Sequence, residues 1–163
     1  MKQVYIFVLL LSLTFTICGQ TTSNTLKYAG TYSYGTDVEK SGTGTIFIYP
    51  ETDSTILFYI NLNRGAPSYN SGSLYGRVKI NKGKGTFYAK FDFIDNGCKW
   101  TFQFAKDYLT IMTVDGKYGC GFGHAVYADG DFKRVSRKTP DFFENAEGTK
   151  VYFKTTTPEH YNK

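Results

Sequence analysis

Residues Cys98–Tyr127 read CKWTFQFAKDYLTIMTVDGKYGCGFGHAVY, and this stretch carries the strongest structural signal in the chain. Large aromatic residues alternate with polar ones over 100–104, and the two-residue period returns over 109–114 and 120–126. Such alternation is typical of β-strands that bury one face. The stretch therefore predicts three consecutive antiparallel strands.

The turns between these runs predict a register. The pair Asp115-Gly116 has the composition of a tight hairpin turn, because glycine accepts a positive φ. A one-sided sheet needs all its large apolar side chains on one face, and pairing through the turns achieves this. The predicted partners are Phe104–Leu109, Phe102–Ile111 and Trp100–Thr113 on one side, and Thr113–Cys120, Ile111–Phe122 and Leu109–His124 on the other.

We expect a disulfide between Cys98 and Cys120, which fall near the same end of that face. The predicted register places a third strand between them, so their Cα atoms would lie about 9–10 Å apart. Disulfides usually need less than about 7 Å. The bridge therefore requires Cys98 to lie in a loop or bulge before its strand, and Asn96-Gly97 offers one. Two reduced, buried cysteines are the alternative.

The rest of the chain continues the same pattern. Aromatic residues make up 18% of the 163 residues and glycines number 17, which favours an antiparallel β protein with many turns. We expect a single β domain over 26–154, an antiparallel barrel of about eight strands, lipocalin-like in outline. A two-sheet β-sandwich is the alternative. Further strands are expected at 26–34, 42–49, 56–62, 74–80, 87–93, 132–136 and 150–154, with a loop at 140–148 and a polar tail at 155–163.

The N-terminus has the pattern of a secretory signal peptide over residues 1–19. Lys2 precedes an apolar run that is too short for a transmembrane helix. Cleavage after Gly19 would release a periplasmic or extracellular protein that begins with a disordered segment, 20–25, and contains no transmembrane segment. The alternative is a lipid anchor on Cys18, although Ile17 stands where a small residue is preferred.

Patterns for catalysis and for metal or cofactor binding are absent from the sequence. The histidines are His124, which the predicted register turns into the barrel, and His160 in the polar tail. No Ser-His-Asp set can be proposed from spacing, and the pair of aspartates at 129–131 does not continue as a calcium loop. The net charge of +5 is dispersed along the strands. We therefore expect a monomeric, non-enzymatic protein without cofactor, metal or nucleic-acid partner.

The most distinctive irregular segment is NRGAPSYNSG, residues 63–72. Arg64, Tyr69 and Asn70 supply a guanidinium, an aromatic ring and an amide, which are the groups that recognition loops use. We expect this loop, together with the turn at 129–131, to contact an unknown protein or glycan. The alternative is that its glycines and proline only turn the chain.

The segment CGFGHAVYADGDFKR, Cys120–Arg134, resembles a recurrent segment of small exported bacterial β-barrel proteins. Those proteins also carry a strand with the pattern Cys-x-x-x-Phe-x-Phe, which Cys98, Phe102 and Phe104 match here. The resemblance covers most of the mature chain. It implies export and an all-β fold, and it carries no assigned activity.

A shorter segment, SGSLY, is similar to the Ser-Gly-x-x-Tyr pattern of bacterial periplasmic lysozyme inhibitors, which insert this loop into the lysozyme active site. The resemblance implies that Ser71 and Tyr75 would enter the enzyme, with a basic contact from Lys82. Three binding functions thus stand side by side: an exported binding protein of unknown ligand, a lysozyme inhibitor, and a carrier of a small apolar ligand. The carrier requires a barrel that aromatic side chains leave hollow.

Overall fold

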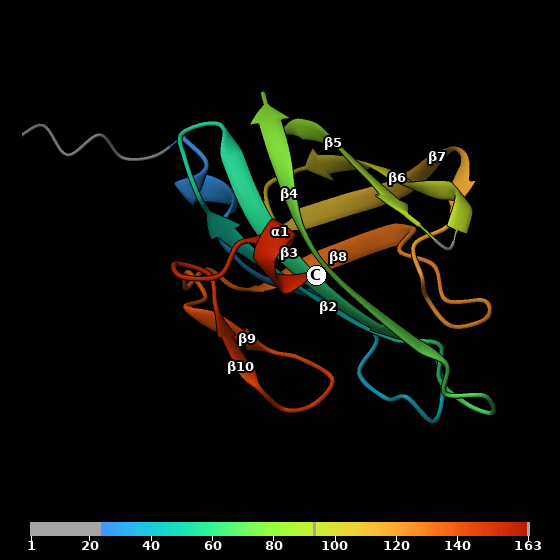
Figure 1. Cartoon of the computed structure of the whole chain (residues 1–163). Helices are drawn as coiled ribbons and strands as arrows, with labels where there is room; N and C mark the ends of the chain where they lie inside the picture. The colour runs from blue at the N-terminus through green and yellow to red at the C-terminus, as the bar shows by residue number, and fades with distance from the viewer. Residues whose placement is uncertain (1–23, 93, 163) are drawn as a thin grey trace, which may run out of the picture.

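Eight strands close into an antiparallel barrel in the computed structural model, which describes residues 24–92 and 94–162 (Figure 1). Each strand pairs with the next along the chain, and the last pairs with the first. The expected barrel is confirmed, and the sandwich alternative is wrong. The expected signal peptide, Cys18 and Phe93 lie outside the described residues. The strands are β1 (Gly30–Tyr34), β2 (Thr43–Pro50), β3 (Thr55–Asn63), β4 (Ser71–Asn81), β5 (Lys84–Phe91), β6 (Ile94–Phe104), β7 (Tyr108–Tyr118) and β8 (Gly130–Ser136).

Aromatic rings fill the middle of the barrel. The ring of Phe58 lies 5.1 Å from that of Phe87 and 5.0 Å from that of Phe102, and Trp100 lies 5.3 Å from Phe87, measured between centroids. All four side chains are buried. An eight-stranded barrel is just wide enough for side chains to fill it, and here they do so at mid-height.

A short 3-10 helix, η1 (Leu26–Tyr28), precedes β1 at one end of the barrel. Arg134 lies over the ring of Tyr32, 4.8 Å from its centroid, and donates a hydrogen bond to the carbonyl of Lys27 in η1 (2.9 Å). The predicted strand at 26–34 therefore begins only at Gly30. A Cβ at this position would lie 2.1 Å from the carbonyl oxygen of Ser136, so only glycine permits the approach.

The chain does not turn at Asp115-Gly116, contrary to the predicted hairpin. Both residues have positive φ, 57° and 64°, and they form a bulge within β7. The strand continues to Tyr118, which pairs with Cys98. The three predicted partners between β6 and the first half of β7 are confirmed.

The third run, 120–126, is a loop and not a strand, so its three predicted partners are wrong. Glycines at every second position of GCGFG remove the side chains that a strand would pack, and Gly121 and Ala125 adopt positive φ. The strand that follows β7 is β8, whose Phe132 and Gly130 stand opposite Leu109 and Ile111.

The disulfide between Cys98 and Cys120 is present, with an S–S distance of 2.09 Å and a Cα–Cα distance of 4.6 Å. Because β7 runs on to Tyr118, Cys120 follows just beyond the residue that pairs with Cys98. No strand separates the two cysteines, and the distance problem of the predicted register disappears.

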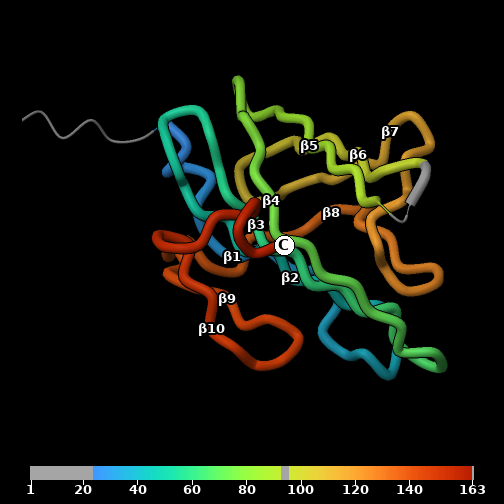
Figure 2. Tube along the Cα trace, in the orientation of Figure 1, coloured from blue at the N-terminus to red at the C-terminus, as the bar shows by residue number. Residues whose placement is uncertain are grey.

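A second layer covers the outside of β3 and β4. It consists of a hairpin, β9 (Phe142–Glu144) and β10 (Lys150–Tyr152), and a short helix, α1 (Pro158–Tyr161) (Figures 1 and 2). The expected loop at 140–148 thus contains a strand, and the expected polar tail contains a helix. No helix in the described part of the chain is long and apolar enough to cross a membrane. The layer encloses a second buried cluster formed by Leu57, Tyr59, Tyr75, Phe143, Val151 and Phe153.

Candidate functional site at the open end of the barrel

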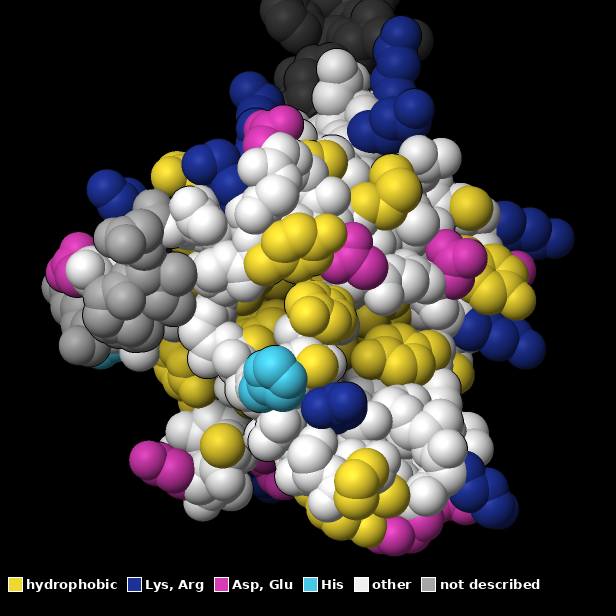
Figure 3. Space-filling view, turned by 90° about the vertical axis from the view of Figure 1, so that its right-hand side faces the viewer, with side chains coloured by type: hydrophobic (Ala, Val, Ile, Leu, Met, Phe, Trp, Pro, Cys, Tyr) yellow, Lys and Arg dark blue, Asp and Glu magenta, His cyan; other side chains and the backbone are white. Residues whose placement is uncertain are grey.

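Three loops gather at the end of the barrel opposite η1: residues 35–42 after β1, residues 64–70 after β3 and residues 119–129 after β7 (Figure 1). Figure 3 faces this end of the molecule. It shows a hollow near the centre of the face, with hydrophobic side chains on its floor and walls and charged side chains around it. The barrel is therefore closed by η1 at one end and hollowed at the other.

The loop at 64–70 is fixed to the loop at 119–129. The side-chain amide of Asn70 donates to the carbonyl of His124 (2.9 Å), and the backbone N–H of Gly123 donates to the carbonyl of Ser71 (2.9 Å). His124 is exposed here, so its predicted place inside the barrel is wrong, because it belongs to a loop and not to a strand. These bonds hold the two loops in one arrangement.

The same loop is also fixed to the loop at 35–42. The N–H of Ala66 donates to the carbonyl of Val38 (3.0 Å), and the hydroxyl of Tyr69 donates to Glu39 Oε2 (2.5 Å). The hydrogen bond to Glu39 raises the pKa of Tyr69. All three loops at the open end are thus cross-linked by hydrogen bonds.

Within the loop at 64–70, the backbone forms a closed turn that presents Arg64. The N–H of Arg64 donates to the carbonyl of Asn70 (2.8 Å), and Asn63 Oδ1 accepts from the N–H of Gly65 (2.7 Å). The guanidinium itself forms no ion pair or hydrogen bond with any described residue. The fold therefore fixes the backbone of Arg64 and leaves its charge available.

We call the pocket enclosed by these loops the mouth. It has a volume of about 230 Å³. A second pocket of about 610 Å³ adjoins it and shares Tyr127 and Asp129, and Tyr118 is the further described residue of its lining. The principal side chains of the mouth are Tyr34, Asn63, Arg64, Val126, Tyr127 and Asp129.

Asp129 anchors the wall of the mouth to β7. Its Oδ1 accepts from the N–H of Thr113 and its Oδ2 accepts from the hydroxyl of the same residue, both at 2.7 Å. Both carboxylate oxygens are therefore engaged. This contact fixes the end of the loop at 119–129 just before β8 begins.

Tyr34 lies half-buried inside the mouth, edge-on to Phe132 with 4.9 Å between ring centroids. Burial raises the pKa of its hydroxyl, so the group stays protonated at neutral pH. No described residue forms a hydrogen bond with this hydroxyl. Tyr34 therefore offers a neutral donor to whatever enters the mouth.

Two exposed tyrosines flank the mouth on the side of the disulfide. Tyr118 and Tyr127 are 56% and 55% exposed, and their rings meet edge to face at 5.6 Å. Exposed aromatic rings that adjoin a pocket are typical of ligand-contact surfaces, because they combine an apolar face with a polar hydroxyl.

The structure brings four of the six predicted binding residues to this end of the molecule: Arg64, Tyr69, Asn70 and Ser71. Tyr75 is not among them. It is fully buried beneath α1, and its hydroxyl donates to the carbonyl of Thr156 (2.7 Å). Burial next to Glu51 raises its pKa. The segment from Ser71 to Tyr75 therefore does not present one exposed surface.

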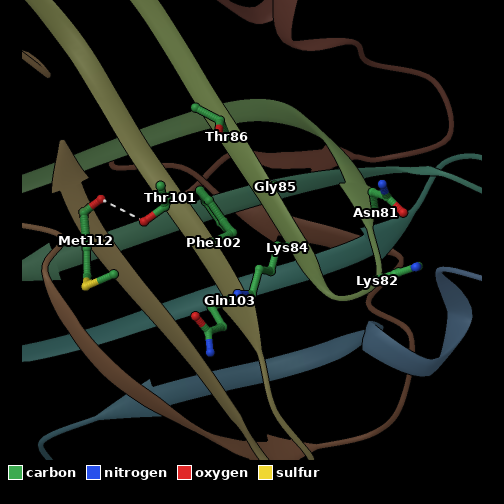
Figure 4. Close-up of a pocket in the computed structure, with 9 residues that line it drawn as sticks. All are labelled: Asn81, Lys82, Lys84, Gly85, Thr86, Thr101, Phe102, Gln103 and Met112. Atoms are coloured by element: carbon green, nitrogen blue, oxygen red, sulfur yellow. Dashed lines mark hydrogen bonds between the residues drawn. The ribbon is translucent and has the colours of Figure 1, made fainter. Parts of the chain in front are cut away.

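Lys82, the sixth predicted residue, lies at the opposite end of the barrel in the turn between β4 and β5. It adjoins a broad hollow of about 700 Å³ on the outer face of β5, β6 and β7 (Figure 4). Figure 4 shows separate side chains along the strands, and Thr101 donates to the carbonyl of Met112 (3.4 Å). This larger hollow lies on the outside of the strands, away from the three cross-linked loops, so we place the candidate site at the mouth.

Sequence reasoning missed Tyr34, Tyr118 and Tyr127. Tyr34 lies in the strand expected at 26–34, Tyr118 was placed in the expected turn at 115–118, and Tyr127 follows the run that was expected to form a third strand. The sequence offered one signal for this loop: glycines at every second position of residues 119–123, which favour a loop over a strand.

No group of three or more His, Cys, Asp or Glu side chains in the described part of the chain is arranged to hold a metal ion. Comparison of the chain with known protein families, curated proteins and solved structures finds no match.

Proposed function

We propose that this chain is an exported, non-enzymatic binding protein that takes its ligand at the mouth of the barrel. One observation carries the proposal: the mouth combines Arg64 and Asp129, from the two segments that the sequence marks for recognition, with Tyr127 in a single pocket. The disulfide supports export, because disulfides persist in oxidising compartments.

The fold supports a site at the mouth and not at the centre. Mouths of β-barrels are frequent ligand sites, and aromatic rings occupy the middle of this barrel. The two adjoining pockets measure about 230 and 610 Å³, against roughly 300–1,000 Å³ for small-molecule sites. A small molecule or a terminal sugar of a glycan is the ligand that fits.

Replacing Tyr127 by alanine is expected to weaken binding at the mouth about tenfold, because the ring supplies apolar contact to both pockets. The measurement is a fluorescence titration of the oxidised protein with N-phenyl-naphthylamine, an uncharged probe that brightens in apolar surroundings. Tyr152→Ala serves as the control, since Tyr152 is similarly exposed (50%) on β10 in the outer layer.

The proposal predicts saturable binding of this probe that Tyr127→Ala weakens and Tyr152→Ala leaves unchanged. Equal affinities in both variants would place the probe elsewhere. The absence of saturable binding, together with a blank screen of bacterial glycans, would remove the proposal.

Inhibition of lysozyme stays a prediction that rests on the sequence resemblance. Assays with chicken-, goose- and invertebrate-type lysozymes test it separately, with Ser71→Ala as the variant. Ser71 is the suitable position because it is exposed at the open end.

A further inference from the structure

We propose that the mouth selects a small amphipathic anion, whose charged group binds Arg64 and whose apolar body lies against Val126 and Tyr127. This inference rests on the proposed function and specifies its ligand class. It follows from which charges at the open end are already paired and which are not.

Every carboxylate on the three loops is engaged within the protein. Asp37 pairs with Lys40 (2.9 Å), Glu39 accepts from the hydroxyl of Tyr69, and Asp129 accepts twice from Thr113. The loop at 64–70 contains no acidic residue. Arg64 is thus the cation of these loops for which the described part of the protein supplies no anion.

The free polar groups of the mouth are donors. The guanidinium of Arg64 presents five N–H groups and accepts nothing, and Tyr34 adds a protonated hydroxyl. Asn63 offers little, since its amide oxygen accepts from Gly65 and its amide nitrogen contacts the carbonyl of Tyr69 (3.4 Å). A site rich in donors and poor in acceptors favours a ligand with several acceptor oxygens, and a planar guanidinium binds carboxylate, sulfate or phosphate with two parallel hydrogen bonds.

The position of Arg64 suits this role because the loop is held before any ligand arrives. Hydrogen bonds from both neighbouring loops fix its backbone, and a preorganised loop loses less entropy on binding. Val126 is 8% exposed and lines the mouth together with Arg64. The hollow with apolar walls in Figure 3 supplies room for the uncharged part of the ligand.

Among the described residues that line the mouth, Asp129 carries the charge that opposes an anion. Both carboxylate oxygens of Asp129 accept hydrogen bonds from Thr113, so the side chain has a structural role. The negative charge of the carboxylate still repels an anion in the mouth. Removing that charge while keeping the shape of the side chain should therefore strengthen binding of an anion. This gives the proposal a second, opposite test.

The experiment compares two probes that share an aromatic body: anilinonaphthalene sulfonate, which carries an anionic group, and N-phenyl-naphthylamine, which does not. The wild-type protein is expected to bind the sulfonate more tightly. Arg64→Gln should lower the affinity for the sulfonate about tenfold and leave the affinity for the uncharged probe unchanged. Arg64→Lys should give an intermediate loss, because lysine keeps the charge without the planar fork, and Asp129→Asn should strengthen sulfonate binding roughly two- to threefold.

Lys82→Gln is the matched control, since it removes the same charge at the opposite end of the barrel. Thermal unfolding of each variant shows whether it is folded. If both probes bind equally well and Arg64→Gln changes neither affinity, the preference for an anion is wrong, while the proposed binding function stands. If Lys82→Gln lowers the affinity for the sulfonate as much as Arg64→Gln does, the effect is due to net charge. That result would also contradict the proposed role of Arg64. Failure of both probes to bind, together with a blank screen of bacterial glycans, would remove the proposed function itself.

Discussion

Replacing both Cys98 and Cys120 by alanine is expected to lower the free energy of unfolding by about 3 kcal/mol. The bridge closes a loop with a sequence separation of 22, and its main effect is to restrict the unfolded chain. Equilibrium unfolding in denaturant, followed by the fluorescence of Trp100, measures the loss. The wild-type protein treated with a reductant should reproduce it.

The same variant is expected to bind ligands at the mouth more weakly. Cys120 is the second residue of the loop at 119–129, and the disulfide ties that loop to β6. Without the bridge the start of the loop is held to β6 by the hydrogen bond from the N–H of Gly119 to the carbonyl of Gly97 (2.8 Å), and its middle by the hydrogen bonds to Ser71 and Asn70. Each single variant, Cys98→Ala and Cys120→Ala, should match the double variant in stability. A double variant that is as stable as the oxidised wild type would contradict the structural role given to the bridge.

The sequence was sufficient to predict the barrel, because the strands carry their own evidence. Trp100, Phe102 and Phe104 alternate with Thr101 and Gln103, and one-sided alternation has few structural explanations. Their pairing followed from a short turn. Such local signals do not depend on knowing the rest of the fold, and here they gave the correct register between β6 and β7.

The sequence was insufficient where a local pattern has two physical solutions. Asp115-Gly116 can form a hairpin turn or a bulge, since both need positive φ. The choice depends on Cys98, which lies far back in the chain and pairs with Tyr118 only if β7 continues. Once that turn was assigned, the glycine-rich segment after it was read as a strand, and His124 was placed inside the barrel.

Prediction of the candidate site was limited by the same dependence on distant contacts. Arg64, Asn70 and Asp129 were identified because loop composition marks them. Tyr34 was not, because a strand residue becomes part of a pocket only through the loops that close over it. Tyr75 was assigned to the surface because nothing in its own strand shows that α1 covers it.

Replacing Phe143 by alanine is expected to lower the free energy of unfolding by about 3–5 kcal/mol. Phe143 is 1% exposed and lies at the centre of the outer cluster. Its ring stacks on that of Tyr59 at 3.8 Å and lies 4.9 Å from that of Tyr75 and 5.3 Å from that of Phe153. The alanine would leave a cavity that three rings now share.

The neighbouring residue supplies the control. Phe142 is half-buried on the other face of β9, where it contacts Tyr152 and Lys150. Phe142→Ala is expected to cost about 0.5–1 kcal/mol. Denaturant unfolding of both variants separates burial from strand propensity, because both remove a phenylalanine from the same strand. Equal losses would show that the outer layer does not pack as a second core.

The size of the loss at Phe143 also reports on how this layer is joined to the barrel. The hydroxyl of Tyr59 is buried and has no hydrogen-bond partner among the described residues. A water that enters the new cavity could reach this hydroxyl, and a satisfied polar group offsets part of the cavity cost. We therefore expect Phe143→Ala to fall near the lower end of its range. Adding Tyr59→Phe should then increase the loss beyond the sum of the single variants, because the cavity becomes wholly apolar and water no longer gains a partner there.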